Sequence, residues 1–108
     1  MKLLSRAEEI LLLTIWRLQG TAYGMSIKAE VEKATGSNWS FGAVYAPLNR
    51  LLKKGLVSAE KGEPTPERGG RSKVFYTLTN DGKDALKALQ KVHQATWVGI
   101  PSLKTDFE

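Results

Sequence analysis

Residues 40–79 constrain the fold of this chain more than any other segment. Ser40 is a preferred N-cap residue, and an amphipathic run follows it until Gly55, a residue type that commonly ends a helix. Two short stretches with the character of strands come next, at 57–61 and 73–78, separated by a loop rich in Gly, Pro and Arg. In a small basic protein, this order predicts a DNA-recognition helix followed by a β-hairpin wing.

The distribution of charge supports this interpretation. The 108 residues have room for one domain, and their formal net charge of +5 favours anionic partners such as nucleic acid. Within residues 49–73, seven Lys and Arg stand against three Glu, a net charge of +4. Most of the excess positive charge therefore belongs to the predicted recognition helix and wing.

The composition excludes several classes of function. The sequence contains no cysteine and one histidine, so it offers no disulfide, no thiolate or multi-histidine metal site, and no evident catalytic set. The apolar run at 10–16 is far shorter than the roughly 20 residues that cross a membrane. We therefore expect a cytoplasmic protein that is not an enzyme, uses no cofactor or metal, and does not contact membranes.

Three further helices are expected outside the opening segment. Ser5 and Glu8 have the spacing of a capping box, so the first helix should begin at Ser5 and end at Gly20. Apolar residues cover nearly every side of this helix, which is typical of a helix buried on two faces. The second helix is expected over 25–34 and the last over 80–97.

The third helix should bury one stripe and expose the opposite face. Its apolar residues follow helical spacing at Val44, Leu48, Leu51 and Leu52. The opposite face carries Asn and Arg, which pair with adenine and guanine, and Lys, which contacts phosphate. The interpretation as an ordinary solvated face stays open. The residues predicted to contact DNA are Ser40, Tyr45, Asn49, Arg50 and Lys53 on the helix and Arg68, Arg71 and Lys73 on the wing.

Two motifs in combination resemble the PadR family of bacterial transcriptional regulators. The first is YAPL at 45–48, where Pro47 is a usual feature of the family pattern. The second is FYTLT at 75–79, followed by Gly82. The resemblance extends over about residues 3–89. It implies a dimeric winged-helix repressor of the short form, in which the last helix makes much of the dimer contact and the first helix contributes.

The predicted fold class is mainly α with a minor β part, a winged helix-turn-helix with a C-terminal dimerisation helix. We expect the DNA-binding domain over 1–79, the dimerisation helix over 80–97 and a tail over 98–108. Apolar side chains on the first and last helices should form the dimer interface. These are Leu11, Ile15, Leu86, Leu89, Val92 and Trp97.

Trp16 and Trp97 allow two interpretations. Both fall on helices assigned to the dimer, so they can simply pack in the interface, where tryptophan is enriched. Alternatively, they line a flat apolar pocket between subunits that binds a small aromatic effector. The family resemblance implies such ligands for some members.

These observations together predict a homodimeric, sequence-specific transcriptional regulator, a repressor that binds a near-palindromic operator in double-stranded DNA. A winged-helix module that docks onto proteins without reading DNA is the alternative function. RNA or nonspecific duplex binding by the same basic patch is a third possibility. A docking module needs no basic face on its third helix, so the placement of charge favours DNA.

Overall fold

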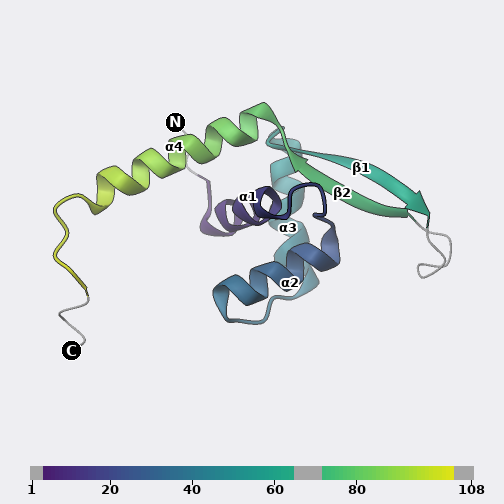
Figure 1. Ribbon diagram of the computed structural model, residues 1–108, viewed down its shortest axis with the longest axis horizontal. Helices are drawn as coiled ribbons and strands as arrows, with labels where there is room; N and C mark the ends of the chain where they lie inside the picture. The colour runs from purple at the N-terminus through teal and green to yellow at the C-terminus, as the bar shows by residue number, and fades with distance from the viewer. Residues whose placement is uncertain (1–3, 65–71, 104–108) are drawn as a thin grey trace.

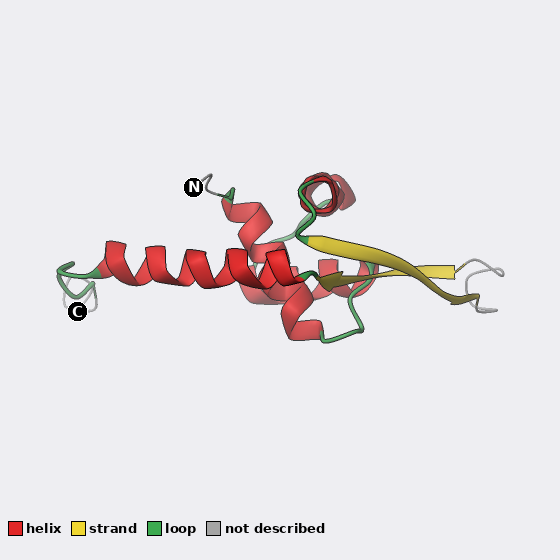
Figure 2. Cartoon of the chain, turned by 90° about the horizontal axis from the view of Figure 1, so that it is seen from above, coloured by secondary structure: helices red, strands yellow, loops and turns green. Residues whose placement is uncertain are grey.

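The computed structural model describes residues 4–64 and 72–103. It contains three helices, a two-stranded hairpin and a last helix (Figure 1). Their bounds are α1 Arg6–Leu18, α2 Gly24–Thr35, α3 Phe41–Lys53, β1 Val57–Pro64, β2 Ser72–Leu78 and α4 Asn80–Trp97. The hairpin and α4 extend in opposite directions from the three-helix body (Figures 1 and 2). The predicted order of elements is therefore confirmed.

The start of α1 is determined by the predicted capping box. The Ser5 hydroxyl accepts a hydrogen bond from the Glu8 N–H at 3.1 Å, and the Glu8 carboxylate accepts one from the Ser5 N–H at 2.9 Å. At the other end, Gln19 and Gly20 both have positive φ, of 39° and 87°. This left-handed pair ends the helix and turns the chain toward α2.

The turn between α2 and α3 is held by side chains of α2. The Trp39 N–H donates to the Glu32 carboxylate at 2.8 Å, and the Trp39 indole N–H donates to the Thr35 hydroxyl at 3.1 Å. Ser40 then caps α3, as predicted, by accepting from the Ala43 N–H at 3.0 Å. These bonds determine where α3 begins and how it leaves α2.

Pro47 lies inside α3 without interrupting it. A proline in a helix interior normally costs about 3 kcal/mol, because it cannot donate the backbone hydrogen bond and its ring crowds the preceding turn. Here the residue is buried, and burial of its ring offsets part of that cost. The helix still starts directly after Ser40, so no later start is needed to accommodate the proline.

The hairpin is anchored at its base. The strands pair antiparallel from Val57 opposite Leu78 to Lys61 opposite Val74, and β1 continues to Pro64 after an irregularity in the register. The Tyr76 N–H donates to the Ala22 carbonyl at 2.8 Å, which attaches β2 to the loop between α1 and α2. Of the loop predicted between the two strands, residues 65–71 lie outside the described part of the chain.

The core lies between the three helices and the base of the hairpin. Its fully buried apolar side chains are Leu11, Leu12, Ala22, Ile27, Val31, Val44, Leu48 and Leu51. The structure corrects two residues of the predicted dimer interface, because Leu11 and Ile15 are only 0% and 2% exposed within one chain. They have no surface to offer a partner. The outward side of α1 carries Leu13 and Trp16 instead.

The junction with α4 is tightly built. Thr79 caps the helix by accepting from the Gly82 N–H at 3.1 Å, and its own N–H donates to the Leu56 carbonyl at 3.1 Å. Leu89 is the last residue of α4 that is buried, and the end of the helix extends beyond the core (Figure 2). No helix in the described ranges is long and apolar enough to cross a membrane.

Candidate nucleic-acid interface

The outward face of α3 presents polar side chains that are free of internal partners. Asn49 and Lys53 lie one turn apart, on the side of α3 opposite Leu48 and Leu51, and both are exposed. Within the part of the chain that the structure describes, neither side chain has a hydrogen-bond or ion-pair partner. Both are therefore available to an external ligand.

Tyr45 lies on a flank of α3 and is turned toward the start of α2. A Cβ atom added at Gly24 would lie 1.9 Å from the Tyr45 hydroxyl, so this tyrosine reaches its position only because residue 24 lacks a side chain. A cavity of about 180 Å³ lies here, lined by Tyr45 and by Lys73 of β2. The structure thus brings together two of the predicted DNA-contacting residues from separate elements.

Lys73 is the one wing cation of the prediction that falls within the described residues; Arg68 and Arg71 lie outside them. Its ammonium lies 4.3 Å from the centre of the Tyr23 ring, a cation–π arrangement that holds the charge beside the start of α2. The contribution of Arg68 and Arg71 to DNA binding stays a prediction.

Ser40 differs from the other predicted contacts because its hydroxyl already has a structural role. It caps α3 by accepting from the Ala43 N–H. The side chain is nevertheless exposed at the beginning of the helix, so its hydroxyl proton can still be donated to a ligand.

Arg50 lies on the opposite flank of α3, next to a buried carboxylate. Its Nε atom is 3.8 Å from a Glu8 carboxylate oxygen, and the Lys54 ammonium is 2.5 Å from the same oxygen. The side chain of Glu8 is only 4% exposed. Sequence reasoning missed this cluster, because the capping box explains Glu8 without any partner outside α1. The available signal was a carboxylate on a helix predicted to be buried on two faces, since a buried charge needs a counter-ion.

The environment of Glu8 lowers its pKa. Burial by itself would raise the pKa of this carboxyl, but the hydrogen bonds from Lys54 and Ser5 and the positive charge of Lys54 together outweigh burial. The charged form is therefore stabilised in the folded protein, and the pKa lies below the ordinary value of 4.5.

This carboxylate should make stability depend on pH in the acid range. Because its pKa is lower in the folded chain, the unfolded chain binds the proton first. The stabilisation is complete above pH 4.5 and is lost as the pH falls through the folded-state pKa. We expect Glu8→Gln to flatten the decline in the free energy of unfolding between about pH 5 and pH 3. Urea unfolding followed by circular dichroism at several pH values measures this slope.

Comparing the pH dependence of the free energy of unfolding in the wild type and in Glu8→Gln isolates the contribution of Glu8. Hydrogen bonds from the Trp39 N–H and Lys28 also lower the pKa of Glu32, but Glu32 is present in both proteins and cancels in the difference. Equal slopes for the wild type and Glu8→Gln would contradict the assignment of the acid sensitivity to Glu8.

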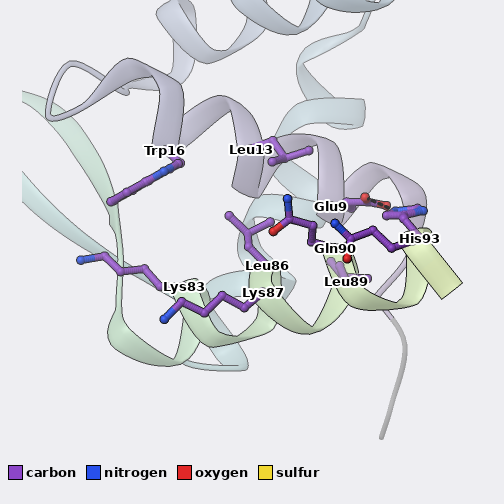
Figure 3. Close-up of a pocket in the computed structure, with 10 residues that line it drawn as sticks. Glu9, Leu13, Trp16, Lys83, Leu86, Lys87, Leu89, Gln90 and His93 are labelled. Atoms are coloured by element: carbon purple, nitrogen blue, oxygen red, sulfur yellow. Dashed lines mark hydrogen bonds and ion pairs between the residues drawn. The ribbon is translucent and has the colours of Figure 1, made fainter.

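A groove of about 640 Å³ runs between α1 and α4 (Figure 3). Leu13 and Trp16 of α1 face Leu86 and Leu89 of α4 across it. Trp16 is 45% exposed, and the ammonium of Lys83 lies 5.0 Å from the centre of its ring. The groove is thus an apolar surface with a cationic side chain at one end.

The other end of the groove is polar. His93 Nε2 and a Glu9 carboxylate oxygen lie 2.6 Å apart (Figure 3). Arg6 donates to the other oxygen of Glu9 at 3.0 Å. The contact between His93 and Glu9 ties the first turn of α1 to α4 across 84 positions of sequence. Sequence reasoning assigned no role to His93, since a lone histidine carries no signal of its partner.

Only some of the predicted interface and pocket residues of α4 lie in the groove. Leu86 and Leu89 line the groove, while Val92 is half-buried and does not line it. Trp97 is 58% exposed and also lies outside the groove. Within the described part of one chain, therefore, the groove lined by Trp16 does not include Trp97, because α4 carries Trp97 beyond the core.

Known proteins share both the sequence pattern and the fold. The model of the transcriptional regulator PadR-like family matches residues 12–88. A PadR-like transcription factor from Bacteroides fragilis is 26% identical, with 82% of this chain and 81% of that chain covered at a TM-score of 0.71. The RosR structure from H. salinarum is 28% identical, with 91% of this chain and 81% of that chain covered at a TM-score of 0.66.

A further similar structure shows the fold alone. It is a transcriptional regulator from Clostridium thermocellum, 22% identical, with 83% of this chain and 82% of that chain covered at a TM-score of 0.68. A comparison with curated proteins gave no match. The structural matches confirm the winged-helix fold predicted from the sequence.

Proposed function

Because this chain belongs to the PadR-like family of transcriptional regulators, we propose that it acts as a homodimer that binds a specific site in double-stranded DNA. The family places the chain among transcriptional regulators and not among enzymes. The observation that carries the proposal is the outward face of α3, where Asn49 and Lys53 are exposed and free of partners within the described part of the chain.

The side chains around α3 suggest a division of roles. Asn49, at the centre of the outward face, is suited to pair with adenine in the major groove, and Lys53 to contact phosphate. Tyr45 and Lys73 share the cavity beside α2 and are suited to the DNA backbone on that flank. Ser40 and Arg50 would add contacts at the beginning of α3 and on its other flank. Arg68 and Arg71 would extend the contact from the wing.

The groove between α1 and α4 supports the dimer. Leu13 and Trp16 expose apolar surface next to a helix whose end extends beyond the core. A second copy is the simplest partner for such a surface, because two-fold symmetry lets each copy cover the groove of the other. Residues 80–97 would then serve as the dimerisation helix of a DNA-binding domain at 1–79. In this arrangement Leu86, Leu89, Val92 and Trp97 would contribute to the contact.

A dimer would carry two copies of α3 related by two-fold symmetry, so its DNA site should be symmetric as well. We propose that the two α3 helices enter successive major grooves of a near-palindromic site, about 10 base pairs apart, and that bound dimer blocks polymerase. This makes the protein a repressor. An aromatic effector bound between the subunits, near Trp16 and Trp97, would change the angle between the two α3 helices and release DNA. The repressor role and the effector stay predictions.

The affinity for DNA should depend steeply on salt, and measurements of sequence preference and salt slope should distinguish the role of Asn49 from that of Lys53. For the wild type, the logarithm of affinity should fall with the logarithm of salt concentration by about 0.9 per phosphate contact. Asn49→Ala should lower the preference for the selected site, by about 1–3 kcal/mol for a lost bidentate pair. Lys53→Ala should weaken all sequences similarly and reduce the salt slope by about 1. Fluorescence anisotropy with a selected site and a scrambled duplex measures both.

Lys91→Ala provides the matched control, since Lys91 is an exposed lysine of α4 that does not line the groove. It should leave the preference and the salt slope unchanged. If Asn49→Ala and Lys53→Ala gave identical profiles, the assigned roles would be wrong. A wild-type affinity that did not respond to salt would refute DNA binding and favour a protein-docking module.

A further inference from the structure

We infer that Glu8 is a specificity-determining residue. Its carboxylate binds Lys54 closely and Arg50 more loosely, and so keeps these cations from contacting DNA phosphates independently of sequence. The inference rests on the proposed function and concerns residues outside the predicted reading face. Glu8 belongs to the first turn of α1, whereas Arg50 and Lys54 lie one turn apart at the end of α3. The contact therefore joins the end of the reading helix to a different element.

The geometry shows how strongly each cation is held. The Lys54 ammonium lies 2.5 Å from the Glu8 carboxylate, and the Arg50 Nε lies 3.8 Å from it. The carboxylate is 4% exposed, so it cannot obtain an equivalent partner from water. Removing Lys54 to a phosphate would leave a buried charge without its closest counter-ion, which is costly. Lys54 is therefore retained, while Arg50 keeps more freedom.

Retention of Lys54 removes a contact that would strengthen binding to DNA of any sequence. A lysine that reaches phosphate releases a counter-ion and adds affinity on any DNA sequence. Lys54 lies one turn after Arg50, on the flank of α3 from which Arg50 is predicted to contact DNA, so a free ammonium at this position would be placed to reach phosphate. By holding it, Glu8 lowers affinity for all sequences. The same bond ties α3 to α1, which preserves the position that base reading requires.

Glu8→Gln tests the inference, because it removes the charge and keeps the shape of the side chain. We expect a nonspecific duplex to bind about three- to tenfold more tightly and the salt slope to become steeper by about 0.9, which corresponds to one additional phosphate contact. The ratio of specific to nonspecific affinity should also fall, because the variant loses the ionic bond that holds α3 against α1 in the position for base reading. In Glu8→Gln/Lys54→Gln, the slope should return to the wild-type value, since the released cation is absent. Anisotropy titrations at several salt concentrations give these quantities.

Glu30→Gln is the matched control. Glu30 pairs with Arg17 at 3.6 Å, so its replacement makes the same change in net charge and also releases a cation, but neither residue belongs to α3. Its salt slope should equal that of the wild type. An unchanged slope in folded Glu8→Gln, or an equal steepening in Glu30→Gln, would overturn the inference.

Lys54→Gln keeps the inference testable if Glu8→Gln does not fold. Lys54 is not a DNA contact in the wild type under this inference, so Lys54→Gln should leave the salt slope unchanged, whereas Lys53→Ala reduces it. A reduction as large as that of Lys53→Ala would refute the role of Glu8. Absence of salt-dependent DNA binding by the wild type would instead refute the proposed function itself, which separates the two failures.

Discussion

Replacement of Gly82 by alanine should lower the free energy of unfolding by about 3 kcal/mol, at the upper end of the range for overpacked sites. A Cβ atom at this position would lie 2.1 Å from the Leu56 carbonyl oxygen, and this oxygen is backbone that cannot rotate away. The same oxygen accepts the Thr79 N–H. Relief of the clash would therefore require α4 to move away from the base of the hairpin. Urea unfolding followed by circular dichroism measures the loss.

Gly42→Ala is the matched control, since Gly42 also lies in the first turn of a helix. The nearest atom to its added Cβ is the Ser40 hydroxyl oxygen at 3.8 Å, an ordinary contact distance. Alanine is favoured over glycine in a helix by about 1 kcal/mol, so this variant should be unchanged or more stable. Similar stability of Gly82→Ala and Gly42→Ala would show that α4 accommodates a side chain at its junction.

Trp16→Glu should convert the proposed dimer into a folded monomer and weaken binding to the proposed operator by about 100-fold or more, because the two copies of α3 are no longer linked. Trp16 is 45% exposed on the wall of the groove, so a carboxylate is tolerated there in one chain. It is not tolerated under an apolar partner surface, where burial of an unpaired charge is costly. Light scattering after size-exclusion chromatography reports the mass, and anisotropy reports the affinity.

Ala95→Glu introduces the same charge on α4 outside the groove. Ala95 is exposed and does not line the groove, so this variant should remain dimeric and bind DNA as the wild type does. A wild type that is monomeric at micromolar concentration would refute the dimer. A Trp16→Glu protein that remains dimeric would show that the two copies meet elsewhere.

The helix starts illustrate what could be predicted locally. Ser5 and Ser40 were predicted to cap helices, and each accepts from a backbone N–H three residues later. Such bonds join residues close in sequence, so their spacing alone identified them. The strand predicted at 73–78 was equally informative, because it forms β2, where Val74, Tyr76 and Leu78 share the face that packs on the core. The family motif at 45–48 accounted for a proline that local rules disfavour.

The two faces of α1 could not be told apart in the same way. Its apolar residues cover nearly every side, and periodicity gave no basis for choosing which side meets the core. Leu11 and Ile15 were predicted for the dimer and proved to be buried within one chain. Leu13 and Trp16, on the outward side, line the groove instead.

The sequence by itself determined the elements, their order and the outward residues of α3, because caps, glycine stops and helical periodicity act over a few positions. Only the tertiary structure decided which charges meet. Glu8 and Lys54 are 46 positions apart, and Glu9 and His93 are 84 apart. Those pairs exist because α1 packs against both α3 and α4, and no local pattern encodes that packing. The same adjacent carboxylates thus connect the first turn of α1 to α3, which is proposed to read DNA, and to α4, which is proposed to form the dimer.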